Sequence, residues 1–136
     1  MVSSSTEAAS ARIAVARLLW DAMRDRDVEA AMALMHDDVE WIPLVTEGGP
    51  VHGTEGLRQH LESVAAAGIV ADAYALDYED VGDGRVLISG AIRVRRPDHW
   101  LATVQRWWIY VISDGKIRRA QACATRADAL ATATAG

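Results

Sequence analysis

The sequence predicts an α+β fold in which a strongly curved, mixed or antiparallel sheet carries three helices, all from the N-terminal half, on its concave face. Two Asp-Gly pairs, Asp83-Gly84 and Asp114-Gly115, stand between long apolar-rich runs. Asp-Gly suits a type I′ hairpin turn because both central residues of that turn need a positive φ. Three segments with helical periodicity come before the hairpins. A bent sheet with helices against one face forms a cup, and we expect this cup to hold a small molecule.

The first two predicted elements are helices. A segment from about 7 to 24 spaces its apolar residues three and four positions apart, Ala16 and Trp20 among them. Trp20 should therefore point inward. Asp27 can cap a second, short helix that runs to about Met35.

A short strand, a loop and a third helix come next. Residues 39–44 alternate in the manner of a strand, with Trp41 on the inward side. A Gly-rich loop over 46–53 leads into a helix from 54 to about 67. His60 lies on the apolar face of this helix, which makes it a candidate wall of the cup.

Four long strands complete the predicted fold. The connection between the second and third of them is Arg96-Pro97-Asp98, and the two Asp-Gly pairs form the other tight turns. A single domain spanning 1–136 accounts for all elements, with fraying expected at 1–6 and 131–136. The expected strands are 70–81, 85–96, 100–112 and 116–125.

Composition limits the partners that we expect. The formal net charge is −5 and the arginines are dispersed, which argues against nucleic-acid binding. The chain shows no basic segment followed by an apolar core at its start, and no stretch approaches a membrane span. The only cysteine, Cys123, suits a reducing compartment and should be a buried structural thiol. We therefore expect a cytoplasmic protein that does not contact membranes.

The histidines give no sign of a metal site. The chain has four of them, scattered without an i, i+4 pair. We expect neither a metal nor a cofactor.

The register of the last hairpin decides which side chains face the cup. If Asp114-Gly115 forms a two-residue turn, Trp107 pairs with Ala122 and Gln105 pairs with Ala124. Large residues on one strand then oppose alanines on the next, and we assign this face to the cup.

The opposite face of the same strand carries Trp108, Tyr110 and Ile112. This surface is too apolar to be fully hydrated, so we expect it to contact the second subunit of a homodimer. The alternative is that Trp107 fills the core and that a terminal segment covers Trp108.

Three segments in this order carry a family resemblance: ALMHDDVEW (33–41), VHGTEGLRQHL (51–61) and ISDGKIRRAQACATRADAL (112–130). With the order of elements, they resemble the SnoaL-like family, which shares a cone-shaped α+β fold with nuclear transport factors, ketosteroid isomerase and limonene epoxide hydrolase. The resemblance covers nearly the whole chain. The family contains cyclases, isomerases, dehydratases, hydrolases and non-catalytic binders, so fold alone does not fix the function.

The catalytic groups of these relatives are only partly present. The general base of ketosteroid isomerase falls on Ile42 or Pro43, and neither side chain can accept a proton. The isomerase's strand-borne oxyanion donor corresponds to Gln105, whose amide N–H could still polarise a carbonyl. The Arg-x-Asp pair of the epoxide hydrolase is replaced by residues 93–95, Arg-Val-Arg.

Three functions stay open at this point. The first is a binder, or an enzyme of unknown reaction, for a small and largely apolar molecule. The second is an isomerase, cyclase or lyase acting on a small apolar carbonyl compound, with His60 as base and Gln105 as oxyanion donor. The third is a dimerisation module whose cup is filled by its own side chains. The predicted ligand-binding residues are Trp20, Trp41, His60, Gln105, Trp107 and Ala122.

Overall fold

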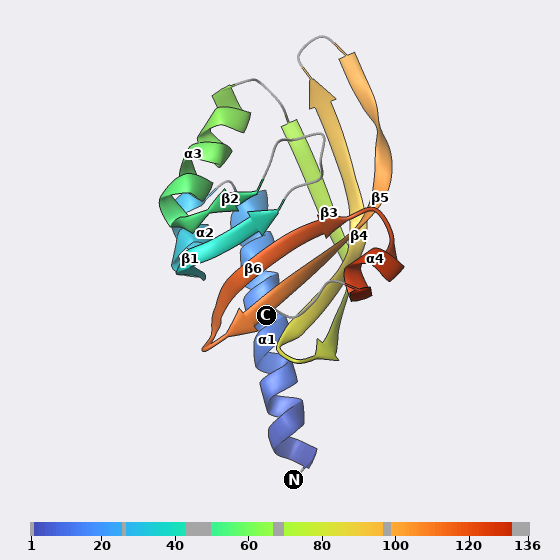
Figure 1. Cartoon of the computed structure of the whole chain (residues 1–136). Coiled ribbons are helices and arrows are strands. Elements are labelled where there is room, and N and C mark those ends of the chain that lie inside the picture. Colours follow the sequence, from blue (N-terminus) through green and yellow to red (C-terminus); the bar gives the residue numbers. More distant parts are fainter. Residues whose placement is uncertain (1, 26, 43–49, 67–69, 97–98, 132–136) are drawn as a thin grey trace.

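The computed structural model describes residues 2–25, 27–42, 50–66, 70–96 and 99–131 of the chain. Side chains are described for 8–25, 27–42, 50–63, 66, 75–91 and 105–131. These residues form one curved sheet with helices on both of its faces (Figure 1).

The sheet has six strands in the order β2-β1-β6-β5-β4-β3. Strand β1 runs parallel to β6, and every other neighbouring pair is antiparallel. The mixed sheet and the four long strands expected from the sequence are thus confirmed. The strands are β1 (Met35–Ile42), β2 (Val51–His52), β3 (Val70–Gly82), β4 (Arg85–Arg96), β5 (His99–Ser113) and β6 (Lys116–Cys123).

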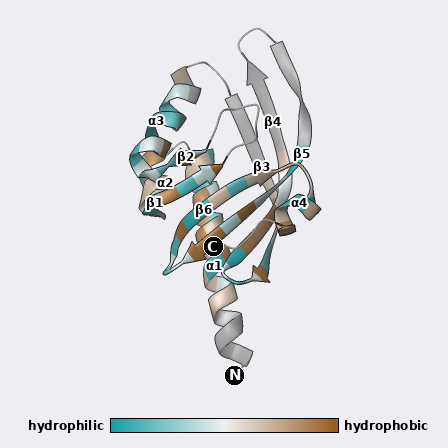
Figure 2. Ribbon diagram, in the orientation of Figure 1, coloured by the Kyte–Doolittle hydropathy of each residue, from teal (hydrophilic) through white to brown (hydrophobic). Residues whose placement is uncertain are grey.

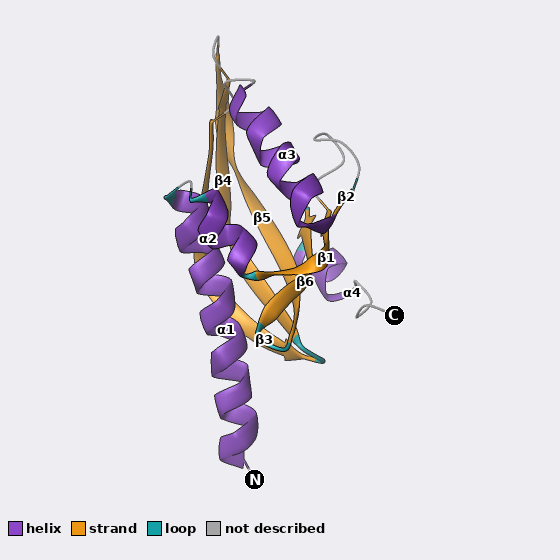
Figure 3. Cartoon of the chain, turned by 90° about the vertical axis from the view of Figure 1, so that its left-hand side faces the viewer, coloured by secondary structure: helices purple, strands orange, loops and turns teal. Residues whose placement is uncertain are grey.

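The helices divide between the two faces of the sheet. Three of them, α1, α2 and α3, contribute residues to the larger apolar core on the concave side, as expected. The short helix α4 packs on the other side, beyond β6 in the view of Figure 3. The helices are α1 (Val2–Arg24), α2 (Val28–Ala33), α3 (Gly53–Ala66) and α4 (Arg126–Ala131).

Both Asp-Gly pairs form the predicted hairpin turns. Asp83 and Gly84 have φ values of 57° and 76°, and Asp114 and Gly115 have 55° and 76°. Positive φ at both central residues defines the type I′ geometry, whose twist matches that of the flanking strands.

The pairing of β5 with β6 departs from the predicted register. Ile112 pairs with Ile117, as a two-residue turn requires, but the next pair joins Val111 to Arg119. Arg118 is therefore the extra residue of a β-bulge. Because side chains alternate between the two faces of a strand, this single extra residue changes which β5 side chain lies beside each β6 side chain on the same face of the sheet.

Beyond the bulge, every pair is shifted by one residue. Trp108, and not Trp107, lies opposite Ala122, and Tyr110 lies opposite Ala120. The expectation of large residues facing alanines is correct, but the large residues are those on the other side of β5.

Two apolar clusters follow from this register. The larger one lies between the concave face and helices α1 to α3, and it contains Leu19, Leu57, Ile88, Tyr110 and Ile112 among its buried residues. The smaller one lies on the outer face and contains Leu87, Ile109, Cys123 and Ala129. Figure 2 shows apolar residues along α1 and the central strands.

Several boundaries differ from the sequence prediction. Helix α1 begins at Val2, earlier than expected. Strand β1 begins at Met35, where the sequence predicted a helix, because the backbone carbonyl of Leu34 accepts a hydrogen bond from the Ile117 N–H at 2.8 Å. The predicted cap of α2 is confirmed, since the Asp27 side chain accepts a hydrogen bond from the Ala30 N–H.

Helix α4 was not predicted. The Thr125 hydroxyl accepts a hydrogen bond from the Asp128 N–H at 3.0 Å at its first turn, which is the N-terminal half of a capping box.

Candidate ligand-binding site

Side chains that share the helix-facing side of the sheet line up in three rows across the strands. The first row contains Trp41, Ala120, Tyr110, Val86 and Asp80. The second contains Ala122, Trp108, Ile88 and Tyr78, and the third contains Arg106, Gly90 and Ala75.

Helix α1 supplies an indole to the second row. The Trp20 and Trp108 rings meet edge to face, with centroids 4.8 Å apart and planes at 80°. Such an aromatic pair stabilises the fold by about 0.5–1.5 kcal/mol beyond its area burial. The Trp20 Nε1 atom is buried and has no hydrogen-bond partner, an arrangement that costs about 1–3 kcal/mol.

Two tyrosines stand beside this indole pair. Tyr110 is only 3% exposed, and burial raises the pKa of its hydroxyl far above the ordinary value, with a smaller contribution from Tyr78. The Trp20 N–H opposes this rise, although it forms no hydrogen bond of regular geometry with the Tyr110 hydroxyl. Partial burial also raises the pKa of Tyr78, against the opposing charge of Arg17, whose guanidinium lies 4.5 Å from the Tyr78 ring centroid.

The carboxylate in the first row is neutralised by α1. Arg12 Nε lies 2.6 Å from an Asp80 carboxylate oxygen. Burial works to raise the pKa of Asp80, but the hydrogen bonds from Arg12 and the Gly82 N–H, together with the Arg12 charge, hold that pKa below its ordinary value. This pair joins α1 to β3 and is not available to a ligand.

Arg106 is the charged side chain of the third row. Its position opposite Gly90, two residues from Trp108, places it on the helix-facing side of β5. The Arg106 Nε atom is buried without a hydrogen-bond partner, and Nη1 donates to the neighbouring Gln105 carbonyl oxygen at 3.0 Å.

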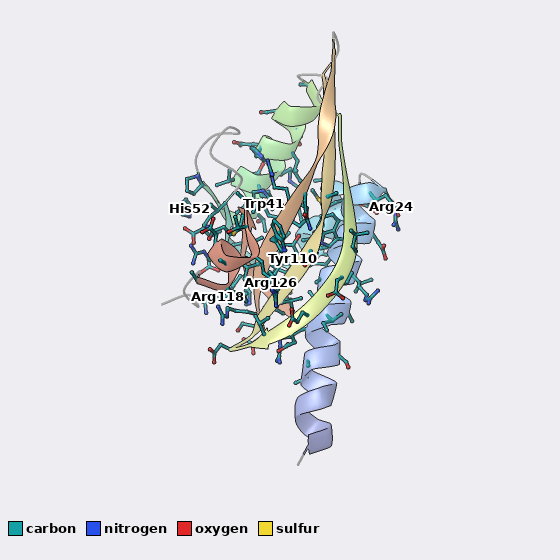
Figure 4. The ribbon with its side chains drawn as sticks, turned by 90° about the vertical axis from the view of Figure 1, so that its right-hand side faces the viewer. Arg24, Trp41, His52, Tyr110, Arg118 and Arg126 are labelled. Atoms are coloured by element: carbon teal, nitrogen blue, oxygen red, sulfur yellow. The ribbon has the colours of Figure 1, made fainter. Side chains whose placement is uncertain are left out.

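Three of the sequence-predicted site residues lie on the concave side. Trp20 and Trp41 pack against the larger core, and Ala122 lies opposite Trp108. Figure 4 shows Trp41 and Tyr110 in the interior between sheet and helices, whereas Arg24, His52 and Arg118 lie at the periphery. The ligand-binding role of these residues stays a prediction.

Gln105 and Trp107 require a correction. They alternate along β5 with Trp108 and Tyr110, which face the larger core, so both lie on the outer face: Gln105 is exposed, and Trp107 packs against the smaller cluster with Cys123. The prediction that both face the helical layer is wrong. The expectation that Cys123 is buried is correct.

The surface assigned to a second subunit also requires a correction. Tyr110 and Ile112 are 3% and 5% exposed within the single chain, and Trp108 packs against the same larger core. The prediction that these three residues form a dimer contact is therefore wrong, since α1 to α3 already cover them.

His60 occupies a half-buried position on α3, next to Leu61 and one turn from the buried Leu57. In the described part of the chain it has no hydrogen-bond or ion-pair partner. The structure does not bring His60 and Gln105 together, because α3 covers the concave side and Gln105 lies on the outer face.

Within the described residues, no three His, Cys, Asp or Glu side chains gather in a way that could hold a metal ion. None of the helices in this part of the chain combines the length and the apolar character needed to cross a bilayer.

The chain belongs to the SnoaL-like domain family, whose sequence pattern matches residues 15–120. No curated protein matches the sequence.

Similar solved structures agree on the fold. TerC, co-crystallised with polyporic acid, is 23% identical with a TM-score of 0.75, and the match covers 87% of this chain and 94% of TerC. An NTF2-like protein of unknown function from Burkholderia pseudomallei is 18% identical with a TM-score of 0.76, covering 87% of this chain and 93% of that protein. A computationally designed 17-OHP binder is 18% identical with a TM-score of 0.70, covering 86% of this chain and 95% of the binder. At these identities the likeness concerns the fold alone.

Sequence reasoning did not select Arg106. Its signal was present, because Arg106 is the one charged residue in an alternating series that contains Val104, Trp108, Tyr110 and Ile112. The predicted register turned this series outward, where an arginine needs no explanation.

Proposed function

We propose that this protein binds a small, largely apolar molecule between helices α1 to α3 and the concave face of the sheet. The observation that carries the proposal is the buried N–H of Trp20, which forms no hydrogen bond of regular geometry, at an aromatic wall formed with Trp108 and Tyr110. Buried donors are almost always paired in proteins. A ligand carbonyl or hydroxyl oxygen would satisfy this donor while its apolar body lies against the aromatic rings.

The contents of similar structures support a ligand of this kind. TerC was crystallised with polyporic acid, and the designed protein binds 17-OHP. We propose no reaction for this chain, because His60 and Gln105 lie on different sides of the sheet. The sequence has a single cysteine, which cannot form an internal disulfide and suits a reducing compartment. We therefore propose that the protein is cytoplasmic.

The test is calorimetric titration of the wild type and two matched Trp→Phe variants with polyporic acid and with 17-OHP. Trp20→Phe keeps an aromatic ring but removes the N–H, and we expect it to weaken binding by about tenfold, the loss of one hydrogen bond. Trp107→Phe changes an indole on the outer face and should bind as the wild type does.

Two outcomes would contradict the proposal. The first is that neither probe binds to the wild type at any soluble concentration. The second is that Trp107→Phe loses as much affinity as Trp20→Phe. Far-UV circular dichroism of both variants identifies any loss that comes from unfolding.

We also propose that two copies of the chain associate through the outer face of the sheet. On neighbouring positions of β4 and β5, this face presents the half-buried Ser89, Ala91 and Trp107 and the exposed Gln105. These four residues carry no charge, which is typical of the centre of a protein interface. We call them the outer patch.

A further inference from the structure

Among the described residues, Arg106 has no carboxylate beside it, unlike three other half-buried arginines. Arg12 is paired with Asp80, Arg58 with Glu29, and Arg119 with Glu40. Among the described residues, Arg106 takes part in no ion pair, and its one hydrogen bond goes to the carbonyl oxygen of the preceding residue.

One donor of the Arg106 guanidinium, its Nε–H, is in an unfavourable position. This Nε–H is buried without an acceptor, and a partly buried cation loses hydration that only an anion or several acceptors can replace. Arginine offers two parallel N–H donors that match the two oxygens of a carboxylate or a similar anion.

The neighbours of Arg106 on its face of the sheet are small or aromatic residues. Its neighbour on β4 is Gly90, which has no side chain, and the next position across the sheet is Ala75. Two residues along β5 on the same face stands Trp108, the ring that meets Trp20. A cationic donor thus adjoins the aromatic wall.

We infer that the ligand of this site is an organic anion with an aromatic or polycyclic body, and that Arg106 binds its carboxylate or enolate oxygens. The inference rests on the proposed function and adds the charge class of the ligand to it. The apolar body would lie toward Trp108 and Trp20, while the anionic end would lie over Gly90 and Ala75.

The experiment compares two probes of the same shape. 2-Naphthoate carries a carboxylate that is ionised at neutral pH, and 2-naphthamide is its uncharged counterpart. We expect the wild type to bind the carboxylate about tenfold to a hundredfold more tightly than the amide by calorimetry, the range for a charge-assisted hydrogen bond.

Arg106→Gln should abolish this preference while its affinity for 2-naphthamide stays at the wild-type level. Arg106→Lys keeps the charge without the paired donors, so it should restore part of the preference. Arg118→Gln is the matched control, because it removes an equal charge at an exposed position of β6, and it should keep the full preference.

The outcomes separate this inference from the proposed function. Equal binding of both probes by the wild type, or a preference that survives in Arg106→Gln, overturns the anion inference while ligand binding itself stands. Failure of both probes to bind contradicts the proposed function and the inference together. Binding of 2-naphthamide by Arg106→Gln shows that this variant is folded.

Discussion

Tyr110 shows how burial on the concave side sets the chemistry of a single residue. Its hydroxyl lies in the larger apolar core, and burial raises its pKa well above the ordinary value. In an unfolded chain the phenol loses its proton near pH 10, whereas the folded state keeps it. The stability that Tyr110 contributes is therefore complete below about pH 10 and is lost as the pH rises toward the folded-state pKa.

We predict that the free energy of unfolding falls with pH above about 10, by about 1.4 kcal/mol per pH unit for this residue. Tyr110→Phe should flatten this fall, because phenylalanine has no proton to lose. Urea denaturation between about pH 8 and 11 measures the slope, to which Tyr78, whose pKa partial burial also raises, adds in the wild type and in the variant alike. An unchanged slope in Tyr110→Phe would contradict the assignment.

At the scale of elements, the two hairpin turns share a backbone geometry but differ in their surroundings. Gly84 and Gly115 both have a φ of 76°. A Cβ atom on Gly84 would lie 2.9 Å from the Ile112 carbonyl oxygen, whereas one on Gly115 would meet nothing within 4 Å. The backbone of Gly84 is held at this distance because its own carbonyl accepts a hydrogen bond from the Ile112 N–H at 2.8 Å.

We predict that Gly84→Ala destabilises the protein more than Gly115→Ala does. Both variants pay about 1 kcal/mol for placing alanine at positive φ. The first also forces two backbone segments apart, which adds about 1–3 kcal/mol. Urea denaturation of the two variants measures the difference, and equal losses would show that the β3–β4 turn is not packed against β5.

The same hairpins show what a sequence can and cannot specify. Asp-Gly pairs restrict the backbone locally, so both turns and all four long strands were predictable. The bulge at Arg118 was not, because Arg118 and Arg119 are alike in sequence and only the packing of both strands decides which is the extra residue. Helix α4 was missed although Thr125 and Asp128 have the spacing of a cap.

The errors in the predicted site come from this one difference, the unpredicted bulge that shifts the pairing of β5 with β6. Trp20 and Trp41 were placed correctly, because helix periodicity and the short strand β1 determine their direction. Gln105 and Trp107 were placed on the wrong face, and Arg106 was missed, because the cup face of β5 was inferred from its pairing with the alanines of β6, and the bulge in β6 shifts that pairing by one residue.

At the scale of the whole molecule, the two faces of the sheet are covered by different helices. The concave face is covered by α1 to α3 and carries the aromatic wall with its unpaired donors. The outer face is covered in part by α4, whose Arg126 lies 3.0 Å from Glu79 on β3. The described residues cover the outer patch only in part, so a second copy could bind there without disturbing the proposed ligand site.

We predict that the wild type is a dimer in sedimentation velocity and that Gln105→Lys shifts it toward the monomer. Gln105 is already exposed in the single chain, so the substitution should leave the fold intact, but two lysines in one isologous interface repel each other and lose hydration. Gln59→Lys makes the same chemical change at an exposed position of α3 and should sediment as the wild type does.

A wild type that stays monomeric at all concentrations, or a Gln105→Lys variant that dimerises as well as Gln59→Lys, would show that the outer patch is not a subunit contact. Since the patch lies across the sheet from Trp20 and Arg106, ligand affinity should be the same in both lysine variants, and this separates assembly from binding.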